Sequence, residues 1–230
     1  MNVALFGGTF DPVHTGHLSA ARAAMKSFGL DQIHFVPASV PPHKRNRPLT
    51  AFAHRYAMVV LACAGSPQFI PSMLEAPGES GEQPNYSLLT VRKMAAQLSP
   101  ADLLYFLIGA DAFLDIPHWY ESAALLDSCH FIIVSRPGFP IAEIEKVIPP
   151  ELREGAARGR AASPTGAPPV AVQNHIALRR PHLHLLNTVE ADISSSAIRH
   201  LASEGKSLSG LVPDAVADYI QKLHLFPNGK

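Results

Sequence analysis

The chain has 230 residues, of which 47% are hydrophobic, so it can bury one full-sized α/β core, or at most two small ones. Lys and Arg total 19, and Asp and Glu also total 19. This zero formal net charge argues against a broad electrostatic surface for nucleic acid or anionic lipid. Neither a signal peptide nor an apolar run of membrane-spanning length is recognisable. We therefore expect a single cytoplasmic domain over residues 1–230, with no nucleic-acid or membrane partner.

Short apolar runs rich in β-branched and aromatic residues alternate with helical patterns along the chain. Buried strands are predicted at residues 2–6, 32–36, 69–74, 103–108 and 131–135. The clearest helix follows the first strand, because apolar residues from Leu18 to Phe28 recur at three- and four-residue spacing before Gly29. Further helices are predicted at residues 51–64, 86–98 and 120–127.

Strands that alternate with helices predict βαβ units and an α/β fold with a Rossmann-like doubly wound parallel sheet. Residues 151–169 break the pattern, because Ala, Gly, Pro and Arg dominate them, and they predict a mobile loop or insertion. A short strand at 182–186 follows, and helices near 195–204 and 213–223 form a small C-terminal helical portion. In such sheets ligands bind beyond the carboxyl ends of the strands, so residues that directly follow strands are the first site candidates.

The first strand runs into the sequence GGTFDPVHTGHL at residues 7–18. Gly7 and Gly8 permit the close backbone approach of a phosphate-binding turn, although the dinucleotide fingerprint and the Walker loop are both absent. His14 and His17 lie three residues apart at the start of a helix, where the macrodipole is positive, so both imidazoles can face one anionic group. Two alternatives are a pair of zinc ligands and a pair of helix caps without chemistry.

A second candidate phosphate site is the sequence ISSSAIR at residues 193–199. Its serines, Ser194, Ser195 and Ser196, can cap a helix and supply short donors, and Arg199 follows Ser196 by three residues on the same face. A helix N-terminus beside an arginine suits an anion. The alternative is an ordinary serine-capped helix with a solvated arginine.

Together these two stretches resemble the signature motifs of the HxGH nucleotidylyltransferase superfamily. The likeness to its bacterial nicotinate-nucleotide adenylyltransferases extends over nearly the full chain. The resemblance implies catalytic roles for His14, His17 and Arg199, with His17 on the α-phosphate of ATP, His14 helping to hold the phosphates, and the second motif on the β- and γ-phosphates. It assigns ATP binding to Gly7, Gly8, Thr9, Phe10, Gly16, Gly109, Ser135, Arg136, Ser194, Ser195 and Ser196.

The stretch VSRPG at 134–138 resembles the family's turn that holds adenine and phosphate. Other stretches carry the resemblance on the acceptor side: PPHK at 41–44, YSLLT at 86–90, IGAD at 108–111 and PHW at 117–119. These four acceptor-side stretches imply acceptor binding by Lys44, Tyr86, Ser87, Asp111 and Trp119. Two structural alternatives to acceptor binding remain. Lys44, Arg45 and Arg47 could form a solvated basic loop, and Trp119 could be a core residue. Leu89 departs from the family pattern, which often has Asp at its position.

The resemblance implies transfer of AMP from ATP to nicotinate mononucleotide, which gives nicotinate adenine dinucleotide and pyrophosphate in NAD biosynthesis. We expect direct in-line attack by a phosphate oxygen, without a covalent intermediate. Mg²⁺ carried with ATP is the expected cofactor, held mostly by phosphate and water, so no metal site on the protein is expected. The alternatives are the same chemistry on nicotinamide mononucleotide or phosphopantetheine, and a non-catalytic nucleotide-binding regulator.

Overall fold

The computed structural model describes residues 1–39, 49–78, 85–135, 139–149, 152, 158–159, 172–177, 182–187 and 193–227. The chain forms two compact units. The first comprises Met1–Gly7, Ala20–His34 and Tyr86–Val189, and the second comprises Gly8–Ser19, Phe35–Asn85 and Glu190–Lys230. The single domain expected over 1–230 stays a prediction. Among the described residues, no helix combines the length and hydrophobicity that crossing a membrane requires.

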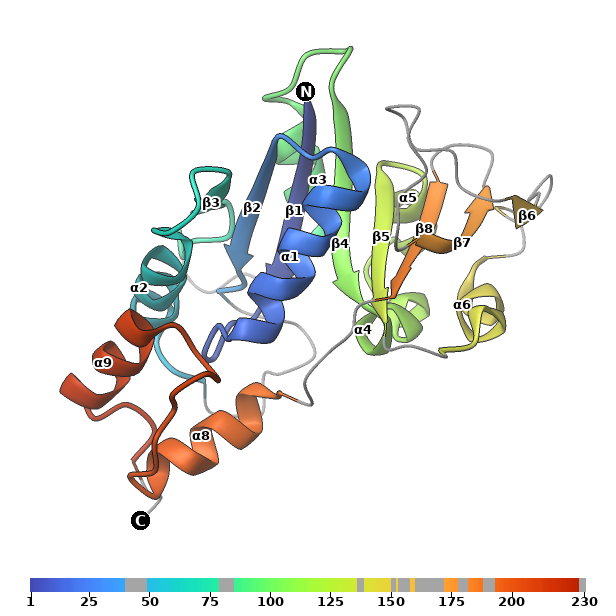
Figure 1. Ribbon diagram of the computed structural model, residues 1–230. Coiled ribbons are helices and arrows are strands. Elements are labelled where there is room, and N and C mark those ends of the chain that lie inside the picture. The colour runs from blue at the N-terminus through green and yellow to red at the C-terminus, as the bar shows by residue number, and fades with distance from the viewer. Residues whose placement is uncertain are drawn as a thin grey trace. The chain divides into compact units, whose positions relative to one another are not determined.

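A parallel sheet forms the centre of the first unit (Figure 1). Its strands pair in the order β2 (Gln32–Pro37), β1 (Asn2–Gly8), β4 (Leu103–Gly109), β5 (His130–Ser135) and β8 (His182–Asn187). The strands β1, β4, β5 and β8 pair in parallel. The sequences of β1, β4 and β5 are almost continuously apolar, as expected for strands buried on both faces, whereas β8 (HLHLLN) contains two histidines and an asparagine. The predicted Rossmann-like α/β class is confirmed.

Two strands of the first unit were not predicted from the sequence. Strand β7 (Val172–Ala177) pairs antiparallel with β8, and β6 (Arg158–Gly159) pairs antiparallel with β7. The register of β7 shifts at a bulge, which disrupts the alternation of apolar and polar residues that identifies a strand. Strand β6 lies inside the segment 151–169, predicted as a mobile loop or insertion. Of that segment, only Leu152 and β6 are among the described residues.

The helices of the first unit include the end of α1 (Thr15–Phe28), α3 (Ser87–Ala95) and α5 (Ser122–Leu126), all within predicted segments. Helices α4 (Ala110–Leu114), η2 (Ile116–His118) and α6 (Ile141–Val147) were not predicted. At five, three and seven residues they are too short to show a clear helical repeat. Phe28 of α1 packs against the rings of Tyr105 and His184, at centroid distances of 6.1 and 5.0 Å.

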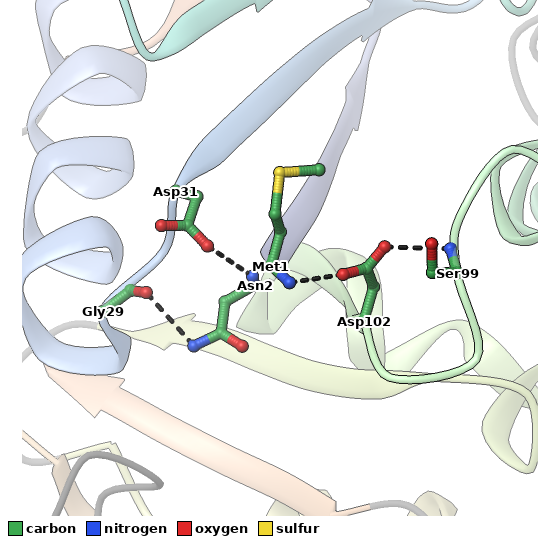
Figure 2. Close-up of polar contacts among 6 residues, drawn as sticks. All are labelled: Met1, Asn2, Gly29, Asp31, Ser99 and Asp102. Carbon is green, nitrogen blue, oxygen red and sulfur yellow. Dashed lines mark hydrogen bonds and ion pairs between the residues drawn. The ribbon is translucent and has the colours of Figure 1, made fainter.

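Polar contacts fix the start of β1 within the first unit (Figure 2). The ammonium group of Met1 forms an ion pair and hydrogen bond with the carboxylate of Asp102, just before β4. The backbone N–H of Asn2 donates to Asp31 Oδ2 over 2.7 Å, and its side-chain amide donates to the carbonyl of Gly29 over 3.1 Å. These contacts join β1 to the turn after α1 and to the start of β4, and so align the strands.

The second unit contains α2 (Phe52–Cys63), β3 (Phe69–Pro71), α8 (Ser195–Ser203) and α9 (Asp214–Lys222), with the ends of β1 and β2 and the first turn of α1. The three helices agree with prediction, whereas β3 is shorter than the predicted 69–74. Phe35 of β2 packs against Phe10 and Phe69, at centroid distances of 5.8 and 5.2 Å. His54 of α2 is hydrogen-bonded to Tyr219 of α9 over 2.9 Å.

Candidate active site

The turn between β1 and α1, in the second unit, holds two histidine rings against each other. The ring centroids of His14 and His17 are 3.6 Å apart, with 32° between their planes. The Phe10 ring meets His17 edge-on at 5.1 Å. Phe10 has a φ of 48°, a costly backbone conformation for a bulky residue, but its side chain is buried. Burial of this ring therefore helps to hold the turn in shape.

Two glycines of the turn make room for these rings. A Cβ atom on Gly16 would lie 3.1 Å from Nδ1 of His14, and one on Gly8 would lie 3.1 Å from the ring of Phe10. An alanine at either position would therefore displace an aromatic ring. Both glycines were predicted to bind ATP, which stays a prediction, and the structure gives each a packing role.

The hydrogen bonding of His17 indicates its tautomer. The backbone N–H of His14 donates to Nδ1 of His17 over 3.2 Å. Nδ1 must then present a lone pair, so the proton of the neutral ring lies on Nε2. A ring in this state can donate a hydrogen bond from its Nε2–H group to a phosphate oxygen.

His14 has a different electrostatic environment. Its side chain is 8% exposed, and its Nδ1 atom has no hydrogen-bond partner among the described residues. Burial lowers the pKa of His14 to about 4, so this ring is neutral at pH 7. A neutral His14 causes no like-charge repulsion with the His17 ring packed against it.

Helix α8 is bonded to the same turn, although it lies far along the chain. Arg199 Nη1 donates to the carbonyl of Asp11 over 2.8 Å, across 188 residues. Ser195 Oγ donates to the carbonyl of Pro12 over 3.0 Å. Arg199 Nη2 also donates to Ser196 Oγ over 3.2 Å. The two stretches predicted as phosphate motifs therefore lie side by side within one unit.

The start of α8 retains donors for an anion. Ser194 caps the helix, because its Oγ accepts from the amide of Ala197 over 3.2 Å. The amides of Ser195 and Ser196 lie in the first turn of the helix, and neither donates to a backbone carbonyl elsewhere among the described residues. Arg199 uses two of its five N–H donors in the bonds above. Backbone and guanidinium donors are thus available at the same helix end.

A buried arginine bonded to the turn was not predicted from the sequence. Arg55 of α2 is 1% exposed, and it donates to the carbonyls of Thr9 and Thr50 over 2.8 Å and of Ser39 over 3.3 Å. Burial lowers the pKa of Arg55, and the nearby Asp11 carboxylate acts in the opposite direction. The available signal was a single arginine amid the apolar residues of FAHRYAMVV.

No group of three or more His, Cys, Asp or Glu side chains suited to a metal ion occurs in the part of the chain that the structure describes. His14 and His17 therefore have no third zinc ligand there.

The start of α1 is held by the chain between α8 and α9. The amide of Thr15 donates to the carbonyl of Leu211 over 2.9 Å, and its hydroxyl donates to the carbonyl of Gly210 over 3.0 Å.

Several predicted site residues lie in the first unit. Gly109 and Ser135 end β4 and β5 at the carboxyl edge of the sheet, where Ser135 Oγ donates to Asn187 Oδ1 over 2.5 Å. A Cβ on Gly109 would meet no atom within 4 Å, so packing does not require a glycine there. Asp111 lies exposed in the first turn of α4, next to this edge. Gly7, near the end of β1, belongs to the same unit.

Aromatic residues predicted to bind the acceptor also lie in the first unit. Tyr86, which precedes Ser87 at the start of α3, stacks on Tyr120 with centroids 4.5 Å apart. Trp119 is half-buried and meets Phe106 edge-on at 6.5 Å, so it is not a fully buried core residue. The predicted residues Lys44 and Arg136 lie outside the described residues, as do Arg45 and Arg47.

Comparison with known proteins identifies the family. The model of the cytidylyltransferase-like family matches residues 5–201. A probable nicotinate-nucleotide adenylyltransferase from Geobacter metallireducens is 36% identical over 234 residues, which cover 100% of both chains. Another from Pseudomonas aeruginosa is 35% identical over 97% of this chain and 96% of the relative. The chain belongs to the nicotinate-nucleotide adenylyltransferase family.

Solved structures of nicotinate-nucleotide adenylyltransferases support the fold. Plasmodium falciparum nicotinic acid mononucleotide adenylyltransferase complexed with NaAD aligns with a TM-score of 0.66 and 22% identity, over 98% of this chain and 97% of that one. A putative nicotinate-nucleotide adenylyltransferase from Vibrio parahaemolyticus aligns with a TM-score of 0.57 and 14% identity, over 99% and 96%. At these identities the likeness concerns the fold alone. The predicted family and enzyme class are confirmed by the sequence relatives.

The buried His14 makes a testable contribution to the acid sensitivity of this adenylyltransferase. Between pH 6.5 and about 4 the unfolded chain protonates this histidine while the folded chain does not. The unfolded state therefore binds more protons, and the free energy of unfolding falls as the pH is lowered through this window. The loss is at most roughly 3 kcal/mol. Urea unfolding of wild type and His14→Gln at pH 7 and pH 4.5 measures it.

We expect His14→Gln to lose less stability than wild type between the two pH values. The matched control is Gln97→Ala, because Gln97 is exposed after α3 and carries no titratable group, so this variant should keep the wild-type pH dependence. An equal acid loss in wild type and His14→Gln would contradict the assignment.

Proposed function

We propose that this chain transfers AMP from ATP to nicotinate mononucleotide, with the triphosphate bound by the turn after β1 and the start of α8. The observation that carries this proposal is the direct bonding of Arg199 and Ser195 to the carbonyls of Asp11 and Pro12. It brings imidazole, amide and guanidinium donors to one short stretch of backbone. Such a set of donors suits a polyanion rather than a neutral ligand.

His17 is proposed to act on the α-phosphate. Its Nδ1 is engaged by the amide of His14, which orients the ring and leaves Nε2 as the donor. Negative charge grows on the phosphoryl oxygens during transfer, so a donor fixed in advance stabilises the transition state without reorganising. His14, neutral and buried, is proposed to hold the His17 ring by stacking and to contact phosphate.

The β- and γ-phosphates leave as pyrophosphate, and we propose that the second motif binds them. The guanidinium of Arg199 and the amides of Ser195 and Ser196 are the donors. Arg199 is held in place by the Asp11 carbonyl, so part of its ordering cost is met before ATP binds. The remaining proposed ATP contacts are Gly7, Gly8, Thr9, Phe10, Gly16, Gly109, Ser135, Arg136 and Ser194.

The acceptor's phosphate is a nucleophile that needs no general base at neutral pH. We propose in-line attack on the α-phosphorus, with no covalent intermediate, so the protein acts by orientation and electrostatics. Mg²⁺ bound to the triphosphate would neutralise the leaving group. The described residues include no cluster of metal-ligating side chains, so we propose that phosphate and water supply most of its ligands.

On the acceptor side we propose contacts from Lys44, Tyr86, Ser87, Asp111 and Trp119. The half-buried indole of Trp119 leaves part of a flat surface exposed, which suits stacking on a pyridine ring. The exposed carboxylate of Asp111, in the first turn of α4, suits hydrogen bonds from ribose hydroxyls.

Purified protein should form a dinucleotide faster from nicotinate mononucleotide than from nicotinamide mononucleotide when given ATP and Mg²⁺. Chromatographic detection of the dinucleotide, with pyrophosphate measured in parallel, tests this over a panel that also includes phosphopantetheine. One pyrophosphate should appear per dinucleotide. Preference for another acceptor would overturn the proposed substrate, and ATP binding without pyrophosphate release would indicate a regulator instead of an enzyme.

A further inference from the structure

Arg55 occupies a position where an arginine is costly. The side chain is 1% exposed, so its charge has been removed almost completely from water. An apolar residue of similar volume would pack the buried face of α2 without this cost. What an apolar residue lacks is the guanidinium's fork of donors, which is rigid and planar.

The three carbonyls that Arg55 contacts come from three separate segments. Thr9 belongs to the turn after β1, Ser39 follows β2, and Thr50 lies just before α2. Asp11 completes the set, because its Oδ2 accepts from the amide of Thr50 over 3.3 Å and its charge favours the charged form of Arg55. One side chain therefore fixes the relative positions of three pieces of backbone.

This backbone is the one that carries the proposed phosphate site. Thr9 and Asp11 flank Phe10, whose φ is 48°, and the Asp11 carbonyl accepts from Arg199. Arg55 and Arg199 thus contact the same three-residue stretch through different carbonyls. A displacement of the backbone of residues Thr9–Asp11 would move Arg199 relative to His17. A misplacement of about 1 Å in an active site can lower the rate about 10²-fold.

We propose that Arg55 is a positioning residue for AMP transfer, which sets the geometry of residues Thr9–Asp11 and through them the proposed phosphate donors. The inference rests on the proposed function and concerns the same site. Arg55 touches no substrate in this account, and it acts through the backbone carbonyls that it binds.

The test compares Arg55→Met and Arg55→Lys with wild type in the dinucleotide assay. Arg55→Met should lower kcat about 10- to 100-fold, and KM for each substrate should change less than about threefold. Arg55→Lys keeps the charge but cannot reach carbonyls on three segments from a single ammonium group, so it should also lower kcat at least about fivefold. Circular dichroism and thermal unfolding verify that each variant is folded.

The matched control is His54→Ala, at the neighbouring position of α2. The His54 side chain bonds Tyr219 of α9, and among the described residues no side-chain hydrogen bond joins it to the turn, so this variant should lose stability but keep kcat within about twofold. A purely structural role for Arg55 predicts that its variants behave like His54→Ala. Wild-type kcat in folded Arg55→Lys and Arg55→Met would overturn the proposal.

Asp11→Asn keeps the test decisive if both Arg55 variants fail to fold. It removes the charge beside Arg55 but keeps an oxygen for the Thr50 amide, and kcat should fall at least about threefold. Unchanged kcat in Asp11→Asn would then overturn the proposal.

The proposed function and the role of Arg55 can fail separately. Wild-type protein that forms no dinucleotide contradicts the proposed function. Active wild type with unaffected variants contradicts only the role of Arg55.

Discussion

Replacing His17 with alanine is expected to lower kcat about 10²- to 10⁴-fold while the fold is kept. The substitution removes the Nε2–H donor proposed for the α-phosphate, and it leaves the amide of His14 without its Nδ1 acceptor. Because the donor acts on charge that develops during transfer, kcat should fall more than the affinity for ATP. Pyrophosphate release at saturating ATP, Mg²⁺ and nicotinate mononucleotide measures the effect.

The control for this prediction is His200→Ala, which removes an exposed imidazole from α8. Its kcat should stay within about twofold of wild type. Wild-type turnover in folded His17→Ala would refute the proposed role of this ring.

Replacing Arg199 with alanine should lower kcat/KM for ATP about 10²- to 10³-fold. The change removes the cation proposed for the leaving pyrophosphate and the bond that joins α8 to the Asp11 carbonyl. Arg199→Lys should recover only a small part of the activity, because one ammonium group cannot contact Asp11, Ser196 and a phosphate as the guanidinium fork can. Initial rates measured over a range of ATP concentrations give this ratio.

The matched control is Arg22→Ala, since Arg22 is an exposed arginine in α1. This variant should retain kcat/KM within about twofold. If Arg199→Ala and Arg22→Ala lose the same small amount, α8 is an ordinary capped helix and does not bind phosphate.

The helices and strands that have a clear local pattern of apolar residues could be predicted from the sequence. Continuous apolar strands alternating with helices predict a parallel sheet, and β1, β4, β5 and β8 form one. Strands β6 and β7 escaped prediction because one has two residues and the other is bulged. Helices α4 and α6, of five and seven residues, were missed for a related reason, since they complete too few turns to display a clear period, whereas the equally short α5 lies within the predicted segment 120–127.

Candidate site residues could be predicted where several potential phosphate-binding side chains stand close together in the sequence. His14, Gly16 and His17 stand together in the sequence, and so do Ser195 and Arg199. The adjacency of these two stretches depends on hydrogen bonds across more than 180 residues, which local patterns do not encode.

Two further features of the site could not be predicted from the sequence: the backbone conformation of Phe10 and the contacts of Arg55. The positive φ of Phe10 and the three carbonyl partners of Arg55 arise only when distant backbone segments meet. A single arginine in an apolar helix is a weak signal, because a solvated arginine gives the same pattern.

A crystal structure with α,β-methylene ATP and Mg²⁺ tests the central claim most directly. We expect the triphosphate within hydrogen-bond distance of His17 Nε2 and, at its other end, of Arg199 and the amides that begin α8. A triphosphate bound elsewhere, or one that contacts the turn after β1 but not α8, would contradict the account.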